Sequence, residues 1–173
     1  LAFSTVLQFS MELVYHLGMS NLFLVNIFFI GQMIILGLFY NSLFYNKAQK
    51  IFVKTSLIIA LLILLIQFVI DSSQFLKFNL FGITLTSLLI VVFALLHFYN
   101  MLTENKKYYY ISMGIVFYLL ASTVLFLIGN LSTGLSADLK YLSWQLNAFL
   151  LIVYYLIILF EWLKSFSRKS LQN

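Results

Sequence analysis

The strongest constraint on this chain is a series of apolar runs, each about 20 residues long, separated by short polar breaks. A bilayer core about 30 Å thick is crossed by a helix of about 20 apolar residues. Only 9% of the residues are charged, against about a quarter in a typical soluble domain. We therefore predict an all-α fold, a polytopic bundle of transmembrane helices in a single domain. The predicted helices are residues 1–19, 21–44, 51–70, 79–102, 109–129 and 141–163.

The basic residues predict the orientation of these helices, because Lys and Arg are enriched in cytoplasmic loops. The breaks and the C-terminal end on one side of the predicted bundle carry nearly all of them. That side has Lys47, Lys50, Lys54, Lys106, Lys107, Lys164, Arg168 and Lys169, and the other side has Lys77 and Lys140. Both ends of the chain are thus predicted to be cytoplasmic, with residues 164–173 as a basic cytoplasmic tail. The alphabet rich in Leu, Ile, Ser and Asn is typical of an AT-rich bacterial genome, and we therefore expect the chain in a bacterial cytoplasmic membrane.

The connections between the predicted helices are too short to hold a soluble domain. The longest, residues 130–140, is typical of a flexible turn. The chain has no cysteine, which excludes disulfides, thiolate metal sites and cysteine nucleophiles. Ten basic residues that mark topology need no nucleic acid to explain them, so we expect no nucleic-acid partner.

One polar stripe stands out in the first predicted helix. Gln8, Glu12 and His16 follow one another at intervals of four residues and therefore share a helix face. An ionisable group near the middle of a membrane costs at least a few kcal/mol, so Glu12 is the first functional candidate. It could accept a proton, contact a ligand or bind an ion, with His16 as its partner. Alternatively, a protonated or hydrogen-bonded Glu12 only specifies helix packing.

Polar residues of the other predicted helices are concentrated in the half that faces outside. This asymmetry favours a pocket that opens outward, although hydrogen bonds between helices would produce a similar set. The candidate ligand-binding residues are Gln8, Glu12, His16, Asn26, Gln32, Gln145 and Asn147.

Catalytic patterns are missing from the sequence. It contains no H-E-x-x-H, no G-x-S-x-G and no glycine-rich phosphate loop, and its acidic residues and histidines are dispersed. We therefore expect no enzyme, no catalytic residue, no metal site and no cofactor. A transporter usually has interrupted helices at its binding site, and few glycines here lie inside the predicted helices, but this alternative stays open.

Several segments are similar to a poorly characterised bacterial family of small seven-helix membrane proteins. They are Met11–Tyr15, Asn21–Ile27 running to Gln32 and Phe39–Tyr40, Thr86–Leu89 to Phe98–Tyr99, Ser112–Ile115 to Tyr118, and Trp144 to Asn147. The resemblance implies a further helix before residue 1, which would make these six of seven helices. It also implies a carboxylate in the second predicted helix, where this chain has Gln32. It implies a membrane sensor or accessory protein and carries over no activity.

These observations predict a non-enzymatic membrane protein, either receptor-like or an accessory subunit, with an outward-facing polar pocket. It would act on a protein partner through its basic face and the segment Ser165–Lys169, or it would form a homo-oligomer, with the lipid bilayer as its environment. The alternatives are a small transporter of an ion or solute, and a structural subunit or membrane-perturbing effector.

Overall fold

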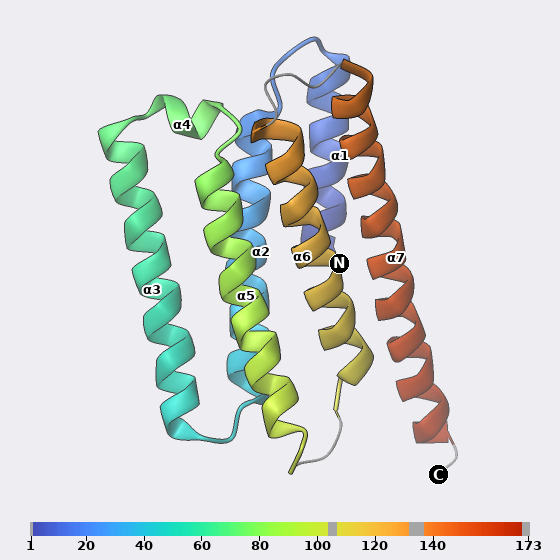
Figure 1. The fold of residues 1–173 in the computed structure, drawn as a ribbon. Coiled ribbons are helices and arrows are strands. Elements are labelled where there is room, and N and C mark those ends of the chain that lie inside the picture. The colour runs from blue at the N-terminus through green and yellow to red at the C-terminus, as the bar shows by residue number, and fades with distance from the viewer. Residues whose placement is uncertain (1, 104–106, 132–136, 171–173) are drawn as a thin grey trace. The chain divides into compact units, whose positions relative to one another are not determined.

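The computed structural model describes the backbone of residues 2–103, 107–131 and 137–170. All regular structure in these ranges is helical, which confirms the predicted all-α class (Figure 1). Five helices are long and apolar enough to cross a membrane, with spans at Leu22–Leu43, Lys47–Ile70, Leu80–Asn100, Tyr109–Gly129 and Gln145–Lys164. The elements are α1 (Ala2–His16), α2 (Leu22–Leu43), α3 (Lys47–Ile70), α4 (Ser73–Leu76), α5 (Leu80–Asn100), α6 (Tyr109–Leu131) and α7 (Ala137–Ser170).

The helix limits differ from the predicted ones in four places. α3 begins at Lys47, four residues before the predicted start. α1 has 15 residues, about 22 Å of helix, and is not among the five candidate spans. The connection predicted at residues 71–77 contains the short helix α4. α7 begins at Ala137 and continues to Ser170, so the segment predicted as a basic tail starts as a helix. The turn predicted within residues 130–140 falls partly on residues 132–136, outside the described chain.

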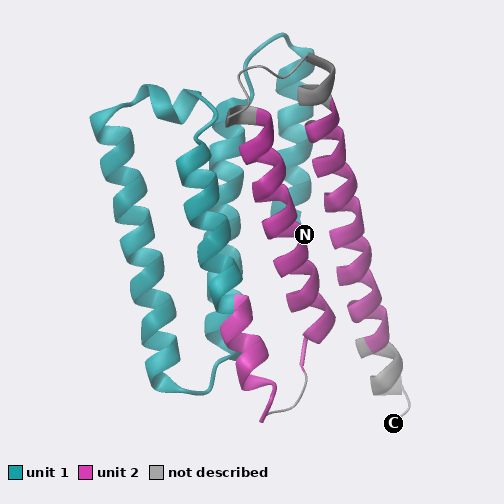
Figure 2. Ribbon diagram, viewed as in Figure 1, with its two compact units in different colours: residues 1–93 teal, residues 94–173 magenta. Residues whose placement is uncertain are grey.

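The chain forms two compact units, residues 1–93 and residues 94–173, and α5 contributes to both (Figure 2). In unit 1, the helix ends follow from local sequence. Gly18, with a φ of 74°, ends α1 because the amides of Gly18 and Met19 donate to the carbonyls of Tyr15 and Val14, a glycine-terminated cap. The Asn46 side chain accepts from the amide of Ala48 and so caps the start of α3.

Close helix contacts in unit 1 occur at glycines. The ring of Phe3 on α1 occupies the space that a Cβ at Gly31 would need, and Leu57 on α3 does the same at Gly37. Both glycines belong to α2, which therefore lies close to α1 and α3. Membrane helices use small residues in this way because dispersion contacts, rather than water exclusion, hold them together.

Unit 2 is built around the α6–α7 hairpin. Gly114 on α6 lies against Ile157 on α7, where an added Cβ would come within 3.1 Å of the Ile157 side chain. Further along the pair, the rings of Tyr118 and Tyr154 stack at a centroid distance of 5.1 Å. The outward side of α7 carries large exposed apolar residues such as Phe149, Ile152 and Leu156, as expected of a helix that faces lipid.

Candidate functional site

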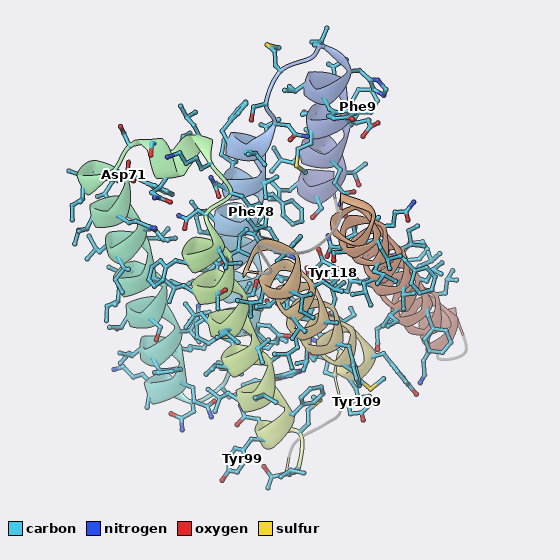
Figure 3. The ribbon with its side chains drawn as sticks, turned by 45° about the horizontal axis from the view of Figure 1, so that its top comes forward. Phe9, Asp71, Phe78, Tyr99, Tyr109 and Tyr118 are labelled. Carbon is cyan, nitrogen blue, oxygen red and sulfur yellow. The ribbon has the colours of Figure 1, made fainter. Side chains whose placement is uncertain are left out.

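The polar stripe of α1 is on its exposed side. Nε2 of His16 lies 3.0 Å from Oε1 of Glu12, and the two side chains are 70% and 69% exposed. Gln8 is half-buried, and Phe9, beside the stripe, is 73% exposed (Figure 3). The predicted common face of Gln8, Glu12 and His16 therefore exists as a surface feature and not as part of an interior pocket.

Two contacts define the level of Glu12 relative to α2. The Asn21 side chain, directly before the first residue of α2, donates to the Met11 carbonyl at 3.1 Å. At the other end of α1, Phe3 packs on Gly31, near the middle of α2. The described α1 thus runs beside only half of α2, and Glu12 lies at the end of α2. The mid-membrane depth expected for Glu12 stays a prediction.

Asn26, another predicted candidate, holds the connection that contains α4. Its Nδ2 donates to the carbonyls of Phe75 at 2.8 Å and Lys77 at 2.9 Å, with a longer contact to Gln74 at 3.3 Å. The side chain is buried. Since its donors are occupied by backbone carbonyls, Asn26 anchors this connection to α2.

A second amide cluster joins α3 to α5 at the same end of unit 1. Gln67 and Asn79 exchange two hydrogen bonds, of 3.2 and 3.0 Å, and Oδ1 of Asn79 also accepts from the amide of Gly82. Asn79 is thereby the N-cap of α5. We call Asn26, Gln67 and Asn79, with the groups they bind, the α4-end network.

Asp71 completes the turn into α4. Hydrogen bonds from the side chains of Ser73 and Gln74 are the main causes that lower the pKa of Asp71 below its ordinary value, because they stabilise the carboxylate. Oδ2 accepts from Gln74 at 2.9 Å, and Oδ1 accepts from the amide of Ser73 at 3.1 Å. The carboxylate is therefore satisfied by its own turn. Figure 3 labels Asp71 at the connection between α3 and α4.

Gln32 is placed differently from the other candidates. Its side chain is 6% exposed, and Oε1 has no hydrogen-bond partner among the described residues. Gln32 and Asn26 are six positions apart on α2, hence about 120° apart around the helix, so they do not face one site. Ser87 on α5 is another buried side chain whose hydroxyl lacks a described partner.

The two candidate residues of unit 2, Asn147 and Gln145, have different surroundings. Asn147 accepts a hydrogen bond of 2.6 Å from the Ser122 hydroxyl and so joins α7 to α6. Gln145 is exposed. Asn147 therefore has a packing role, and Gln145 has no described contact with it.

A polar cluster that we did not single out from the sequence lies at the start of α6. Oε2 of Glu161, on α7, accepts from the amide of Tyr110 at 3.1 Å, and Nζ of Lys164 lies 4.5 Å from the centre of the Tyr110 ring. Nearby in the chain, Nε2 of His97 donates to the carbonyl of Lys107 at 2.9 Å. The one signal of this cluster in the sequence is the run Tyr108–Tyr110 beside Lys107, a pattern that is typical of the aromatic belt at a membrane interface.

Within unit 1, the predicted site residues lie on different helix faces. Five lie in unit 1, on two helices and at least three faces, and two lie in unit 2. Within the described ranges, no group of three or more His, Cys, Asp or Glu residues could hold a metal ion. The arrangement provides hydrogen bonds between helices and one exposed ionisable pair.

Comparisons with models of protein families, with curated proteins and with solved structures find no match. The five long apolar helices are those of an integral membrane protein. The resemblance to the seven-helix family stays a prediction.

Proposed function

We propose that this chain is a non-enzymatic accessory subunit of the bacterial cytoplasmic membrane, which binds a transmembrane helix of another protein through α1. The observation that carries the proposal is the exposed Glu12–His16 pair on α1, with the exposed apolar side chains of Phe9 and Leu13 on the same helix. The predicted charge bias supports an orientation in which the α4 end faces outside and the C-terminus faces the cytoplasm.

The chemistry of the α1 surface favours a partner with a basic or hydrogen-bond-donating residue. A carboxylate at the edge of the bilayer gains most from a partner that supplies such a donor, because few waters compete there. A second copy of this chain fits less well, since a two-fold contact through α1 would bring Glu12 against Glu12. Phe9 and Leu13, both exposed, supply apolar contact area around the pair.

The satisfied polar groups elsewhere support an accessory role over a sensor with an outward pocket. Asn26, Asn79 and Asn147 have protein partners, so a ligand would have to displace existing hydrogen bonds. One observation favours the second candidate, a receptor or transporter for a small polar ligand. It is the buried Oε1 of Gln32, which has no partner in the described chain.

Photo-crosslinking in the native membrane tests the accessory role. A photoreactive phenylalanine analogue would replace Phe9, and the matched control would carry it at Phe117, which is 66% exposed on α6. We expect one discrete adduct with a different membrane protein from position 9, and a marked loss of that adduct when Glu12→Gln is added. Equal labelling from both positions, or an adduct with a second copy, would overturn the proposal.

A flux assay in liposomes distinguishes a transporter from an accessory subunit. A transporter would give solute- or proton-dependent uptake that Gln32→Leu abolishes. An accessory subunit should give no uptake above that of empty liposomes.

A further inference from the structure

The start of α6 brings two ammonium groups onto aromatic rings. Lys164, on α7, lies with Nζ 4.5 Å from the centre of the Tyr110 ring and 6.0 Å from that of Phe160. The Tyr110 and Phe160 rings meet edge to face at 5.4 Å, so the platform under Lys164 is itself held in place. The attraction between a cation and the ring face keeps the ammonium group at the level of the aromatic belt.

Lys107 makes a similar contact just before α6 begins. Its Nζ lies 5.1 Å from the centre of the Tyr108 ring, and its carbonyl accepts from His97. Tyr108 has a φ of 57°, a conformation that is uncommon for tyrosine, and its carbonyl accepts from the amide of Ser112 in the first turn of α6. The carbonyls of Lys107 and Tyr108 are therefore both held by hydrogen bonds. We call Lys107, Tyr108, Tyr110 and Lys164 the lysine–tyrosine cluster.

The carboxylate of Glu161 also contacts the start of α6. Glu161 is turned toward the N-terminus of α6, where it accepts from the amide of Tyr110. A cation–ring contact leaves the N–H donors of an ammonium group available, so both lysines can still bind an anion.

We propose that the lysine–tyrosine cluster binds the phosphate of an anionic phospholipid at the membrane surface. The cluster stands at the end of a membrane-spanning helix, where lipid phosphates lie, and its net charge is complementary to an acidic headgroup. The exposed apolar side of α7, including Leu156 and Leu159, offers a surface for the acyl chains. α7 remains helical to Ser170, so position 168, an arginine, follows Lys164 by one turn.

The fluorescence of Trp162 can report which lipids lie near Lys164. The chain has two tryptophans, so Trp144→Phe leaves Trp162 as the single fluorophore, two residues from Lys164 and exposed. This protein would be reconstituted in phosphatidylcholine vesicles with a small fraction of brominated lipid, which quenches tryptophan on contact. We expect brominated phosphatidylglycerol to quench Trp162 several-fold more effectively than brominated phosphatidylcholine.

Lysine variants then identify the site. Lys107→Gln and Lys164→Gln should each lower the preference for phosphatidylglycerol by up to about fivefold, the share expected for one basic residue near a membrane surface. Lys164→Arg should retain it. The matched control is Lys77→Gln, whose Nζ donates to Ser73 in unit 1, and it should have no effect.

Three results would overturn the proposal. They are equal quenching by the two lipids, an unchanged preference in Lys107→Gln, and an equal loss in Lys77→Gln. Lys107 is exposed, so its substitution is not expected to prevent folding. Inorganic phosphate, matched in ionic strength with chloride, should leave the preference unchanged. If phosphate abolishes it, the site binds the free anion rather than a lipid.

Discussion

Unit 1 has polar groups in two very different settings, the α4-end network and the surface of α1. In the network, buried amides use their donors and acceptors on one another and on backbone carbonyls. On α1, Glu12 and His16 pair with each other and are largely exposed. Closed networks specify a fold, whereas an exposed ionisable pair on an apolar helix is available to a partner. The predictions below test that distinction, beginning with the largest expected effect on stability.

Asn26 should be the most sensitive position of the closed network. Asn26→Leu keeps the approximate volume but leaves the carbonyls of Phe75 and Lys77 without their donor, at a cost of about 2–3 kcal/mol in the free energy of unfolding. Unfolding by sodium dodecyl sulfate in mixed micelles measures this loss. The control is Ser42→Ala, which removes an exposed hydroxyl bonded within its own helix. Similar stability of both variants would mean that Asn26 does not anchor the connection.

The Gln67–Asn79 pair should show coupling. Gln67→Leu leaves both polar groups of the Asn79 amide without the partner from α3, so the single variant should lose about 1–2 kcal/mol. A double-mutant cycle with Asn79→Leu should give a coupling free energy of about 1 kcal/mol. Asn79→Leu alone should cost more than Gln67→Leu because it also removes the cap on Gly82. Additive losses would show that the two amides act independently.

Unit 2 contains a single hydrogen bond of this kind, from Ser122 to Asn147, and its loss should have a smaller effect on stability. Asn147→Leu removes one hydrogen bond to Ser122, and such bonds between membrane helices contribute about 0.6 kcal/mol on average. We expect a loss of that size in the same unfolding assay. Ser122→Ala should cost as much, and the double variant should lose no more than either single one. Gln145→Leu, at an exposed position, is the control and should leave stability unchanged.

The sequence predicted the long helices because their apolar runs reach the length of a bilayer span. It did not predict α4, which has four residues and depends on contacts with distant parts of the chain. Asn26 meets Phe75 across 49 positions, and Glu161 meets Tyr110 across 51, so no local pattern could assign their roles. The level of Glu12 beside α2 depends on the contact of Asn21 with Met11, ten positions apart, which the repeat of polar residues along α1 does not reveal.

Asp71 is a carboxylate whose oxygens accept hydrogen bonds from its own turn, in contrast to the exposed carboxylate of Glu12. Because hydrogen bonds lower the pKa of Asp71 in the folded protein, its contribution is present above the unfolded pKa and is lost as pH falls through the folded pKa. We expect α4 to lose hydrogen-exchange protection as pH is lowered below about 4. Asp71→Asn should remove this pH dependence. A transition that persists in Asp71→Asn would belong to another carboxylate.

Glu12 should have the smallest effect on stability. An exposed ion pair four residues apart on a helix contributes about 0.5 kcal/mol or less, so Glu12→Gln should leave unfolding in micelles nearly unchanged. His16→Gln should behave alike, since each substitution removes the same contact. Loss of the crosslink from position 9 without loss of stability would then reflect partner binding rather than folding. A destabilisation comparable to that of Asn26→Leu would instead place Glu12 among the residues that hold the fold, and the distinction between the two settings would fail.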